Sequence, residues 1–434
     1  SRILLDCGIN VAAPEEHAYP LFDCPEFRIN EIDAVIVSHS HLDHCAMIPL
    51  LIKYGYKGPI YCTAPVRDIM ALLALDYISV GYQEIKNPPF SAADVKQMVK
   101  QTICLDYEEV SDITPDIRIT LYNAGHTLGS SMVHLHIGNG LHNLLYTGDM
   151  NYEKANLLPA AVTKFPRLET LIVESTYGAK DDILPSRKEC EEQLFGIVNE
   201  TAKRGGNVLM PVLGVGRSQE IMIILEKAMK EGKIPKIPIY LQGMVWDVNA
   251  IHTAYPDFFS AQVKRSIFHK DENPFLSDTF TQVASRKEMT QVIDSGDPCI
   301  IMATSGMMVG GASVEYFKNL AENPKHSLVL TSYQGEGSLG RRLQNGEKEI
   351  GYAAGHGKSN VVRVKCDIHT INGFTGHSTR PQLMSFFHKL DPKPKRIIVN
   401  HGENSKCLDL ASSAHKALRI ETNAPRNLDA LRLK

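Results

Sequence analysis

The stretch Val37-Ser38-His39-Ser40-His41-Leu42-Asp43-His44 decides how the whole sequence is interpreted. It overlaps the apolar run 34–37, which is short and β-branched and therefore predicts a buried strand. Three histidines and an aspartate within six residues after a strand are typical of a metal site. A tetrahedral zinc takes four ligands and keeps one position for water when it is catalytic. The cluster holds more ligands than one such ion needs and predicts two adjacent metals.

Further ligand types follow other predicted strands. His126 comes after the strand-like run 117–121, and Asp149 comes after the apolar pair 144–145. Each stands next to a glycine, which lets the backbone approach closely. Asp149 is the natural bridging carboxylate, and His401, which follows the run 396–399, is expected to complete the second metal site.

Strand and helix patterns alternate along most of the chain and predict α/β layers. Strands are expected at 34–37, 171–173, 208–213, 300–303, 328–330 and 396–399. An amphipathic helix is expected at 219–231, where apolar residues recur with helical spacing and Gly232 supplies a stop. Polar or glycine-rich stretches at 178–186 and 372–376 mark candidate domain boundaries.

Composition limits the remaining possibilities. The 434 residues suggest two or three domains, and 43% hydrophobic residues exclude a disordered chain. No apolar run approaches the length of a membrane span. The net charge of −3 excludes a strongly basic nucleic-acid binder, although not a local basic groove. Nine scattered cysteines without a C-x-x-C pair favour a reducing, cytoplasmic location. The opening without methionine suggests a fragment.

Several motifs resemble a known family. HSHLDH (39–44), AGHTLGS (124–130) and YTGD (146–149), with Asp6 in LLDCG, resemble the metallo-β-lactamase fold. Glu174 in IVESTYG, His377 in GFTGHS and His401 in VNHGE are similar to the β-CASP branch of nucleases. From Ser1 to Lys434 the amino-acid sequence is most similar to the archaeal homologues of the nuclease subunit of the cleavage and polyadenylation specificity factor. Those proteins usually carry N-terminal KH domains and a hairpin before LLDCG, and these 434 residues include neither.

The resemblance implies a metallo-β-lactamase αββα sandwich with an inserted α/β β-CASP domain. The expected domains are 1–185 for the first part of the lactamase domain, 186–375 for the β-CASP domain and 376–434 for the C-terminal lactamase part. The middle is assigned as an insertion because His377 and His401 must return to the site that begins at His39.

The resemblance also implies a zinc-dependent ribonuclease that acts in RNA 3′-end processing or transcription termination. One zinc would be held by His39, His41 and His126, and the other by Asp43, His44 and His401, with Asp149 between them. Two zincs about 3.5–4 Å apart would share a hydroxide that attacks phosphorus. Glu174 would orient His377 to protonate the leaving 3′ oxygen or to stabilise the phosphate, and Asp6 would fix ligand orientation. Glu174, His377, Asp6 and Asp43 are thus the catalytic candidates, and an additional 5′–3′ exonuclease activity stays open.

Candidate RNA contacts lie in the middle of the chain. Arg217 follows the glycine pair 214 and 216 after a predicted strand, where backbone amides favour phosphate, although a plain tight turn has the same pattern. Ser305 and Gly306 repeat this arrangement, and Arg341 and Arg342 are either RNA contacts or salt-bridge partners. The resemblance also implies a homodimer and suggests contact with the transcription machinery, and no membrane partner is expected.

Three other functions compete with a ribonuclease. A thioesterase or lactonase would share the core, but the long insertion and the Glu174–His377 pair argue against it. A scaffold without activity would lack metal ligands, and a DNA nuclease of this branch would lack the histidine at 401.

His134 and His136 alternate on one predicted strand without a nearby acid and are expected to be ordinary sheet residues.

Overall fold

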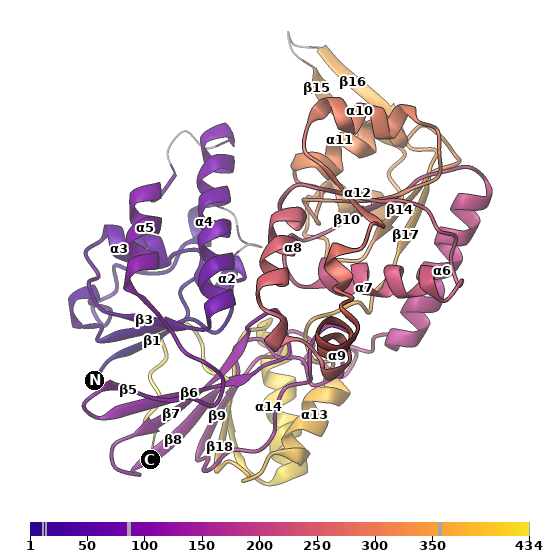
Figure 1. The fold of residues 1–434 in the computed structure, drawn as a ribbon. Coiled ribbons are helices and arrows are strands. Elements are labelled where there is room, and N and C mark those ends of the chain that lie inside the picture. The colour runs from indigo at the N-terminus through magenta and orange to yellow at the C-terminus, as the bar shows by residue number, and fades with distance from the viewer. Residues whose placement is uncertain (11–12, 14, 85–87, 355–357, 434) are drawn as a thin grey trace. The chain divides into compact units, whose positions relative to one another are not determined.

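The computed structural model describes residues 1–10, 13, 15–84, 88–354 and 358–433, and the chain divides into two compact units. Unit 1 comprises residues 1–183 and 376–434, and unit 2 comprises residues 184–375. Figure 1 shows both as layered α/β structures. Among the described residues, no helix is long and apolar enough to span a membrane.

Unit 1 begins with a four-stranded parallel sheet in the order β1-β2-β3-β4. Its strands are β1 (Ile3–Leu5), β2 (Ala34–Ile36), β3 (Ile60–Cys62) and β4 (Thr102–Cys104). One face packs against α3 (Ile48–Lys53), α4 (Ala64–Glu84) and α5 (Ala92–Gln101) in a core that includes Val35, Leu51 and Met98. The shorter elements of this region are α1 (Glu15–Ala18), η1 (Ile29–Glu31) and α2 (Leu42–Cys45).

A seven-stranded sheet forms the second layer of unit 1, in the order β19-β18-β9-β8-β7-β6-β5. Strands β5 to β8 are antiparallel, and β8, β9, β18 and β19 are parallel. Strands β9 and β18, far apart in sequence, lie side by side in Figure 1. The bounds are β5 (Val110–Thr114), β6 (Ile117–Asn123), β7 (Ser131–Ile137), β8 (His142–Tyr146), β9 (Thr170–Val173), β18 (Arg396–Val399) and β19 (Glu421–Asn423).

The two sheets of unit 1 face one another across a common core. Ile36 and Tyr61 of the first sheet pack with Leu121, Leu135 and Leu144 of the second. The outer face of the second sheet is covered by α13 (Arg380–Lys389) and α14 (Asn404–Leu418). The layers are therefore α, β, β and α, and the predicted fold class is confirmed.

Unit 2 contains a six-stranded sheet in the order β12-β11-β13-β10-β14-β17, in which all pairs are parallel. Parallel strands covered on both faces read as continuous apolar runs, which is how 208–211 and 300–303 look in the sequence. The strands are β10 (Val208–Pro211), β11 (Ile239–Gln242), β12 (Phe280–Val283), β13 (Ile300–Ala303), β14 (Ser327–Leu330) and β17 (Asp367–Thr370). Strand β10 ends at Pro211, two residues before the end of the expected strand 208–213.

Helices and a hairpin complete unit 2. The expected helix 219–231 is α7 (Arg217–Lys230), which starts earlier because its polar first turn lies outside the apolar pattern. The other helices are α6 (Arg187–Lys203), α8 (Met244–Ala254), η2 (Pro256–Phe258), α9 (Ala261–Lys270), η3 (Pro274–Leu276), α10 (Arg286–Asp294), α11 (Gly311–Leu320) and α12 (Leu339–Gln344). Strands β15 (Glu349–Ala354) and β16 (Lys358–Arg363) pair as an antiparallel hairpin.

Candidate metal centre

Three histidines and one aspartate of unit 1 form the first group of potential ligands: His39, His41, His126 and Asp149. Their ligand atoms all lie within 4.8 Å of one another. Nδ1 of His41 lies 3.2 Å from Nε2 of His39 and 3.0 Å from Nε2 of His126. Oδ2 of Asp149 lies 3.5 Å from Nε2 of His39. The loops after β2, β6 and β8 thus bring together side chains from three strand ends.

A second group shares Asp149 and consists of Asp43, His44, Asp149 and His401. Nε2 of His44 lies 3.4 Å from Oδ2 of Asp149, and Nε2 of His401 lies 3.2 Å from its Oδ1. Oδ2 of Asp43 lies 3.8 Å from both imidazole nitrogens. The two carboxylate oxygens of Asp149 can therefore serve two ions. The side chains of Asp43 and His401 are 32% and 31% exposed, so this side of the centre is open to solvent.

Hydrogen bonds on the outer sides of the rings fix which nitrogens face inward. Nδ1 of His126 donates to the carbonyl oxygen of Gly376 at 2.7 Å. The Ser38 hydroxyl donates to Asp6, and its oxygen accepts from Nδ1 of His39. The Nε2 atoms of His39 and His126 therefore carry lone pairs and point at Nδ1 of His41. A proton on Nδ1 of His41 could serve only one of these two nitrogens and would leave the other without a donor. A cation among the three nitrogens would serve them all, so these residues fit a metal ion.

Asp6 holds the second group in the same way. Its Oδ2 accepts from Nδ1 of His44 and from the hydroxyl of Tyr146, each at 2.7 Å, and its Oδ1 accepts from the backbone N–H of Ser38 at 2.7 Å. Nε2 of His44 and Oδ1 of Asp149 are buried and make no hydrogen bond among the described atoms. Unpaired buried polar atoms that face one another indicate a place for an ion.

Burial and charge set the protonation of these ligands. Burial lowers the pKa of His39 and of His126 well below its usual value and lowers that of His41 to about 4. Burial also opposes the charge on His44, but Asp149 and Asp6 outweigh it and raise the pKa of this ring. Three of the rings are thus neutral at pH 7, which is the form that binds metal.

Glu174 and His377 lie beside the centre as a pair. Nδ1 of His377 lies 3.0 Å from Oε2 of Glu174, whose Oε1 accepts from the backbone N–H of Met150 at 2.8 Å. Glu174 is buried, and the same Nδ1 lies 3.8 Å from Oδ2 of Asp149. The two residues form a third potential ligand group with Asp149. Nδ1 of His377 donates to Glu174, so this nitrogen is engaged by the carboxylate.

Tight backbone packing brings these elements together. Gly148, with φ of +52°, precedes Asp149, and a Cβ added to it would lie 2.6 Å from the Ser38 side chain. A larger residue would push the Asp149 loop away from the His39 loop. This confirms the close approach expected from the glycine beside Asp149.

Sequence reasoning missed several residues that orient the ligands, namely Ser38, Tyr146 and Gly376. Ser38 and Tyr146 stand inside the quoted motifs, so their polar groups offered a signal. Gly376 acts through its carbonyl oxygen, and no side chain marks it. His134 and His136 lie on β7 and bond to each other and to Arg167 and Asn143, outside both ligand groups.

The candidate RNA contacts all lie in unit 2. Arg217 is the first residue of α7, directly after the glycine loop that follows β10. The Ser305 hydroxyl bonds to Val309 and Gly310 within its own loop, and a Cβ on Gly306 would lie 2.9 Å from the backbone of Leu213. These contacts give Ser305 and Gly306 a structural role.

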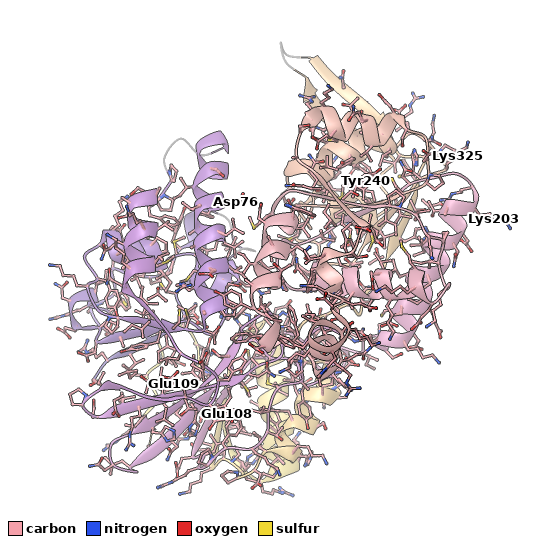
Figure 2. The ribbon with its side chains drawn as sticks, in the orientation of Figure 1. Asp76, Glu108, Glu109, Lys203, Tyr240 and Lys325 are labelled. Carbon is pink, nitrogen blue, oxygen red and sulfur yellow. The ribbon has the colours of Figure 1, made fainter. Side chains whose placement is uncertain are left out.

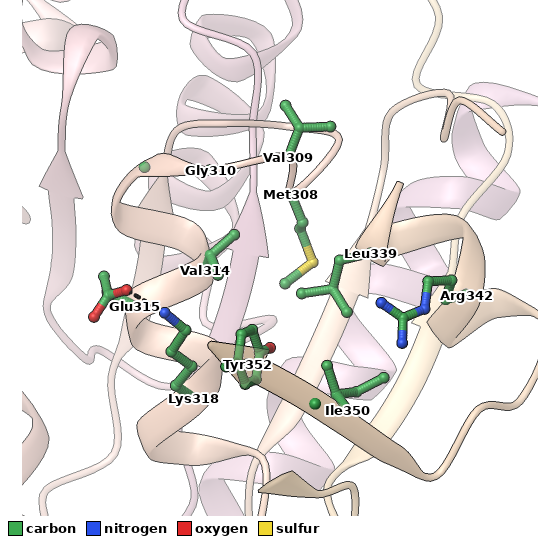
Figure 3. A pocket seen from close by; sticks show the side chains of 12 residues that line it. Met308, Val309, Gly310, Val314, Glu315, Lys318, Leu339, Arg342, Ile350 and Tyr352 are labelled. Carbon is green, nitrogen blue, oxygen red and sulfur yellow. Dashed lines mark hydrogen bonds and ion pairs between the residues drawn. The ribbon is translucent and has the colours of Figure 1, made fainter. Parts of the chain in front are cut away.

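The two neighbouring arginines have different partners. Arg342 makes two hydrogen bonds to Glu347, at 2.6 and 2.7 Å, whereas the guanidinium of Arg341 lies 6.0 Å from the centre of the Tyr333 ring. Arg342 also lines a cavity of about 330 Å³ with Met308, Leu339 and Tyr352 (Figure 3).

Two exposed lysines of unit 2, Lys203 and Lys325, are labelled in Figure 2. They precede β10 and β14 in the sequence, so they lie at the end of these strands that is opposite to the loop of Arg217.

Three known domain families match the sequence. The metallo-beta-lactamase superfamily domain matches residues 1–175, the Beta-Casp domain matches 218–343, and the Zn-dependent metallo-hydrolase RNA specificity domain matches 361–425.

Relatives match along the whole chain. The transcription termination factor FttA of Methanocaldococcus jannaschii is 52% identical over 434 residues, which is 100% of this chain and 68% of the relative. FttA of Thermococcus kodakarensis is 52% identical over 441 residues with the same coverage. A crystal structure of a protein of unknown function from Enterococcus faecalis is 13% identical, with a TM-score of 0.55 over 98% of this chain and 92% of that one. That likeness concerns the fold alone.

Proposed function

The chain belongs to the family of the transcription termination factor FttA, and we propose that it is a metal-dependent ribonuclease acting in transcription termination or RNA 3′-end processing. The observation that carries this proposal is the pair of ligand groups that share Asp149. The matches to the Beta-Casp and RNA specificity domains support RNA as the substrate.

We propose zinc as the metal, with two ions per chain. Five imidazoles and two carboxylates form a nitrogen-rich ligand set of the kind zinc takes. His39, His41 and His126 would hold one ion, Asp43, His44 and His401 the other, and Asp149 both. Paired metal ions lower the pKa of a shared water and neutralise charge on phosphate oxygens. Asp6 keeps Nε2 of His44 turned toward the centre, and such supports typically change metal affinity about 10–100-fold.

The proton for the leaving 3′ oxygen is assigned to His377. Its Nδ1 donates to the buried Glu174 carboxylate, which fixes the orientation of the ring. The other ring nitrogen, Nε2, would deliver the proton to the leaving oxygen. Asp43 contributes as a partly exposed ligand on the open side of the centre.

Unit 2 would supply the RNA contacts predicted from the sequence. Arg217 starts a helix, where the N-terminal dipole also attracts phosphate, and Arg341 lies beside the exposed Tyr333 ring. Arg342 would have to share its guanidinium between Glu347 and RNA. We assign the domains as 1–185 and 376–434 for the lactamase part and 186–375 for the β-CASP part, which the two compact units support.

A circular RNA tests the proposal, because it has no end from which an exonuclease can start. The zinc-loaded chain should linearise it and leave 5′-phosphate and 3′-hydroxyl ends. A circular DNA of the same sequence and a thioester are offered in parallel. Asp149→Ala should lose metal and show no cleavage while its circular dichroism spectrum stays that of the folded chain.

Other outcomes would exclude the proposal or parts of it. Cleavage of the thioester or of the DNA without any cleavage of the RNA would exclude a ribonuclease. Cleavage of linear RNA alone, from its 5′ end, would exclude internal cutting. An active sample holding one metal ion per chain would exclude the pair.

A further inference from the structure

Two cysteines of unit 1 that belong to neither ligand group face each other on neighbouring strands. The register of the parallel pair β3·β4 places Cys62 directly opposite Cys104. Cys62 is fully buried in the core under α4 and α5, and Cys104 is half-buried at the end of the edge strand β4. Both are free thiols, and the centre at Asp149 uses neither.

Their spacing suits a disulfide. Neighbouring strands lie about 4.7–4.9 Å apart, and disulfides join Cα atoms about 4.4–6.8 Å apart. Residues opposite one another in a parallel pair also point to the same face of the sheet. Because the register already places the two residues side by side, a bridge would need a change of side-chain rotamer and little movement of the backbone.

The surroundings shift the pKa values of the two thiols in opposite directions. The hydrogen bond from Cys62 lowers the pKa of Cys104 to about 7, with burial and Asp68 opposing and Arg67 assisting. The same hydrogen bond and burial raise the pKa of Cys62. Arg67 and Asp68 lie on α4, where Nε of Arg67 donates to Oδ1 of Asp68 at 2.8 Å. Cys104 is therefore about half thiolate at pH 7, and Cys62 remains a thiol. Thiolates, not thiols, are the nucleophiles.

We propose that Cys62 and Cys104 are an oxidisable dithiol that a peroxide converts to a disulfide and a thiol reductant restores. The Cys104 sulfur attacks one peroxide oxygen, so that an S–O bond forms, the O–O bond breaks, and the departing oxygen takes a proton to give water. The Cys62 thiol then loses its proton and attacks the Cys104 sulfur, which forms the S–S bond and releases the second oxygen as water. One peroxide is reduced to two waters while two thiols are oxidised.

One hydrogen bond would connect a Cys62–Cys104 disulfide to a loop of the metal centre. Thr63 follows Cys62 directly, and its hydroxyl donates to the carbonyl oxygen of Gly129 at 2.7 Å. Gly129 lies in the same loop as His126. A disulfide at Cys62 would therefore form next to a strand end that is hydrogen-bonded to the loop of His126.

Peptide mapping of the full chain after hydrogen peroxide treatment tests the proposal. We expect a cross-linked peptide joining the β3 and β4 segments, lighter by two hydrogen atoms and cleaved by dithiothreitol. Cys104→Ser should abolish it, whereas Cys24→Ser, which changes another half-buried cysteine, should leave it intact. Oxidation of Cys104 to sulfinic or sulfonic acid without a cross-link, or a bridge between other cysteines, would overturn the proposal.

Alkylation kinetics give a second readout that does not need an oxidant. Iodoacetamide should modify Cys104 with a midpoint near pH 7. Cys62→Ala removes the hydrogen-bond donor and should move the midpoint toward the ordinary thiol value of about 8.5. Cys62→Ser keeps a donor and should shift it less. An unshifted midpoint in a folded Cys62→Ala chain would mean that the two thiols are not coupled.

Discussion

At the scale of single residues, the centre depends on carboxylates that each hold several partners. Asp6 accepts from four donors at once, and Glu174 accepts from the Met150 N–H and from His377. Asp6 and His401 also have positive φ angles, +61° and +48°, which non-glycine residues adopt only when their surroundings impose it. The local backbone is thus held in a costly shape where ligands must converge.

His377→Ala separates proton transfer from metal binding. The variant should keep both metal ions and bind RNA as before, because seven other residues supply ligands. Its cleavage rate should fall by about 10²–10⁴-fold, the usual contribution of a positioned proton donor. Metal analysis, RNA titration and single-turnover cleavage measure the three quantities.

Glu174→Gln is the companion variant. The amide retains the shape of Glu174 but lacks its charge, so cleavage should slow in the same direction with metal content unchanged. A His377→Ala chain that has lost a metal ion would make this histidine a ligand. A normal cleavage rate would assign the proton to another group or to water.

At the scale of elements, the ligands come from short loops locked to their neighbours. The segment after β1 lies against α2: the N–H of Cys7 donates to the carbonyl of His44 at 2.7 Å, and that of Ile9 donates to Leu42 at 3.0 Å. Between them a Cβ on Gly8 would lie 1.9 Å from the backbone of Asp43. The position of α2, and with it of two ligands, depends on this glycine.

Gly8→Ala should therefore displace α2 and weaken the second metal site. Overpacking of this kind costs about 1–3 kcal/mol, and we expect a lower melting temperature together with loss of one metal ion per chain. Gly196→Ala is the matched control, because Gly196 is exposed in α6 with nothing within 4 Å of the added Cβ. It should be neutral or stabilise slightly. Equal metal content in both variants would show that α2 tolerates the shift.

The same elements show what the sequence could predict. Strands with continuous apolar runs, such as β13 and β18, were found at their observed bounds because burial on both faces leaves a strong signal. His401 was predicted as a ligand because it follows β18, and ligand types cluster at strand ends. The carbonyl of Gly376 and the pairing of Cys62 with Cys104 depend on tertiary register, which no local pattern encodes. The roles of the ligands and of Glu174 and His377 stay predictions.

At the scale of the whole molecule, the C-terminal segment bears on the oligomeric state. It follows β19, the outermost strand of the seven-stranded sheet, and within the described part of the chain only one edge of β19 is paired. Leu433 packs on the core between the sheets, and Arg396 donates to the carbonyl of Arg432 at 2.7 Å. The end of the tail therefore docks on its own unit, while Leu428 and Leu431 remain 68% and 39% exposed.

We predict a homodimer that buries these two leucines. Exposed edge strands and neighbouring apolar side chains favour pairing with another chain. Burial of a leucine contributes about 1.5–3 kcal/mol, so Leu428→Asp with Leu431→Asp should weaken dimerisation by at least about a hundredfold. Light scattering at micromolar concentration should give a dimer for the unchanged chain and a monomer for the double variant, with equal metal content because the ligands lie elsewhere in unit 1. Leu141→Asp, which changes a leucine 81% exposed in the turn between β7 and β8, should remain a dimer. A monomeric mass for the unchanged chain would refute the dimer, and a dimeric double variant would place the interface on another surface.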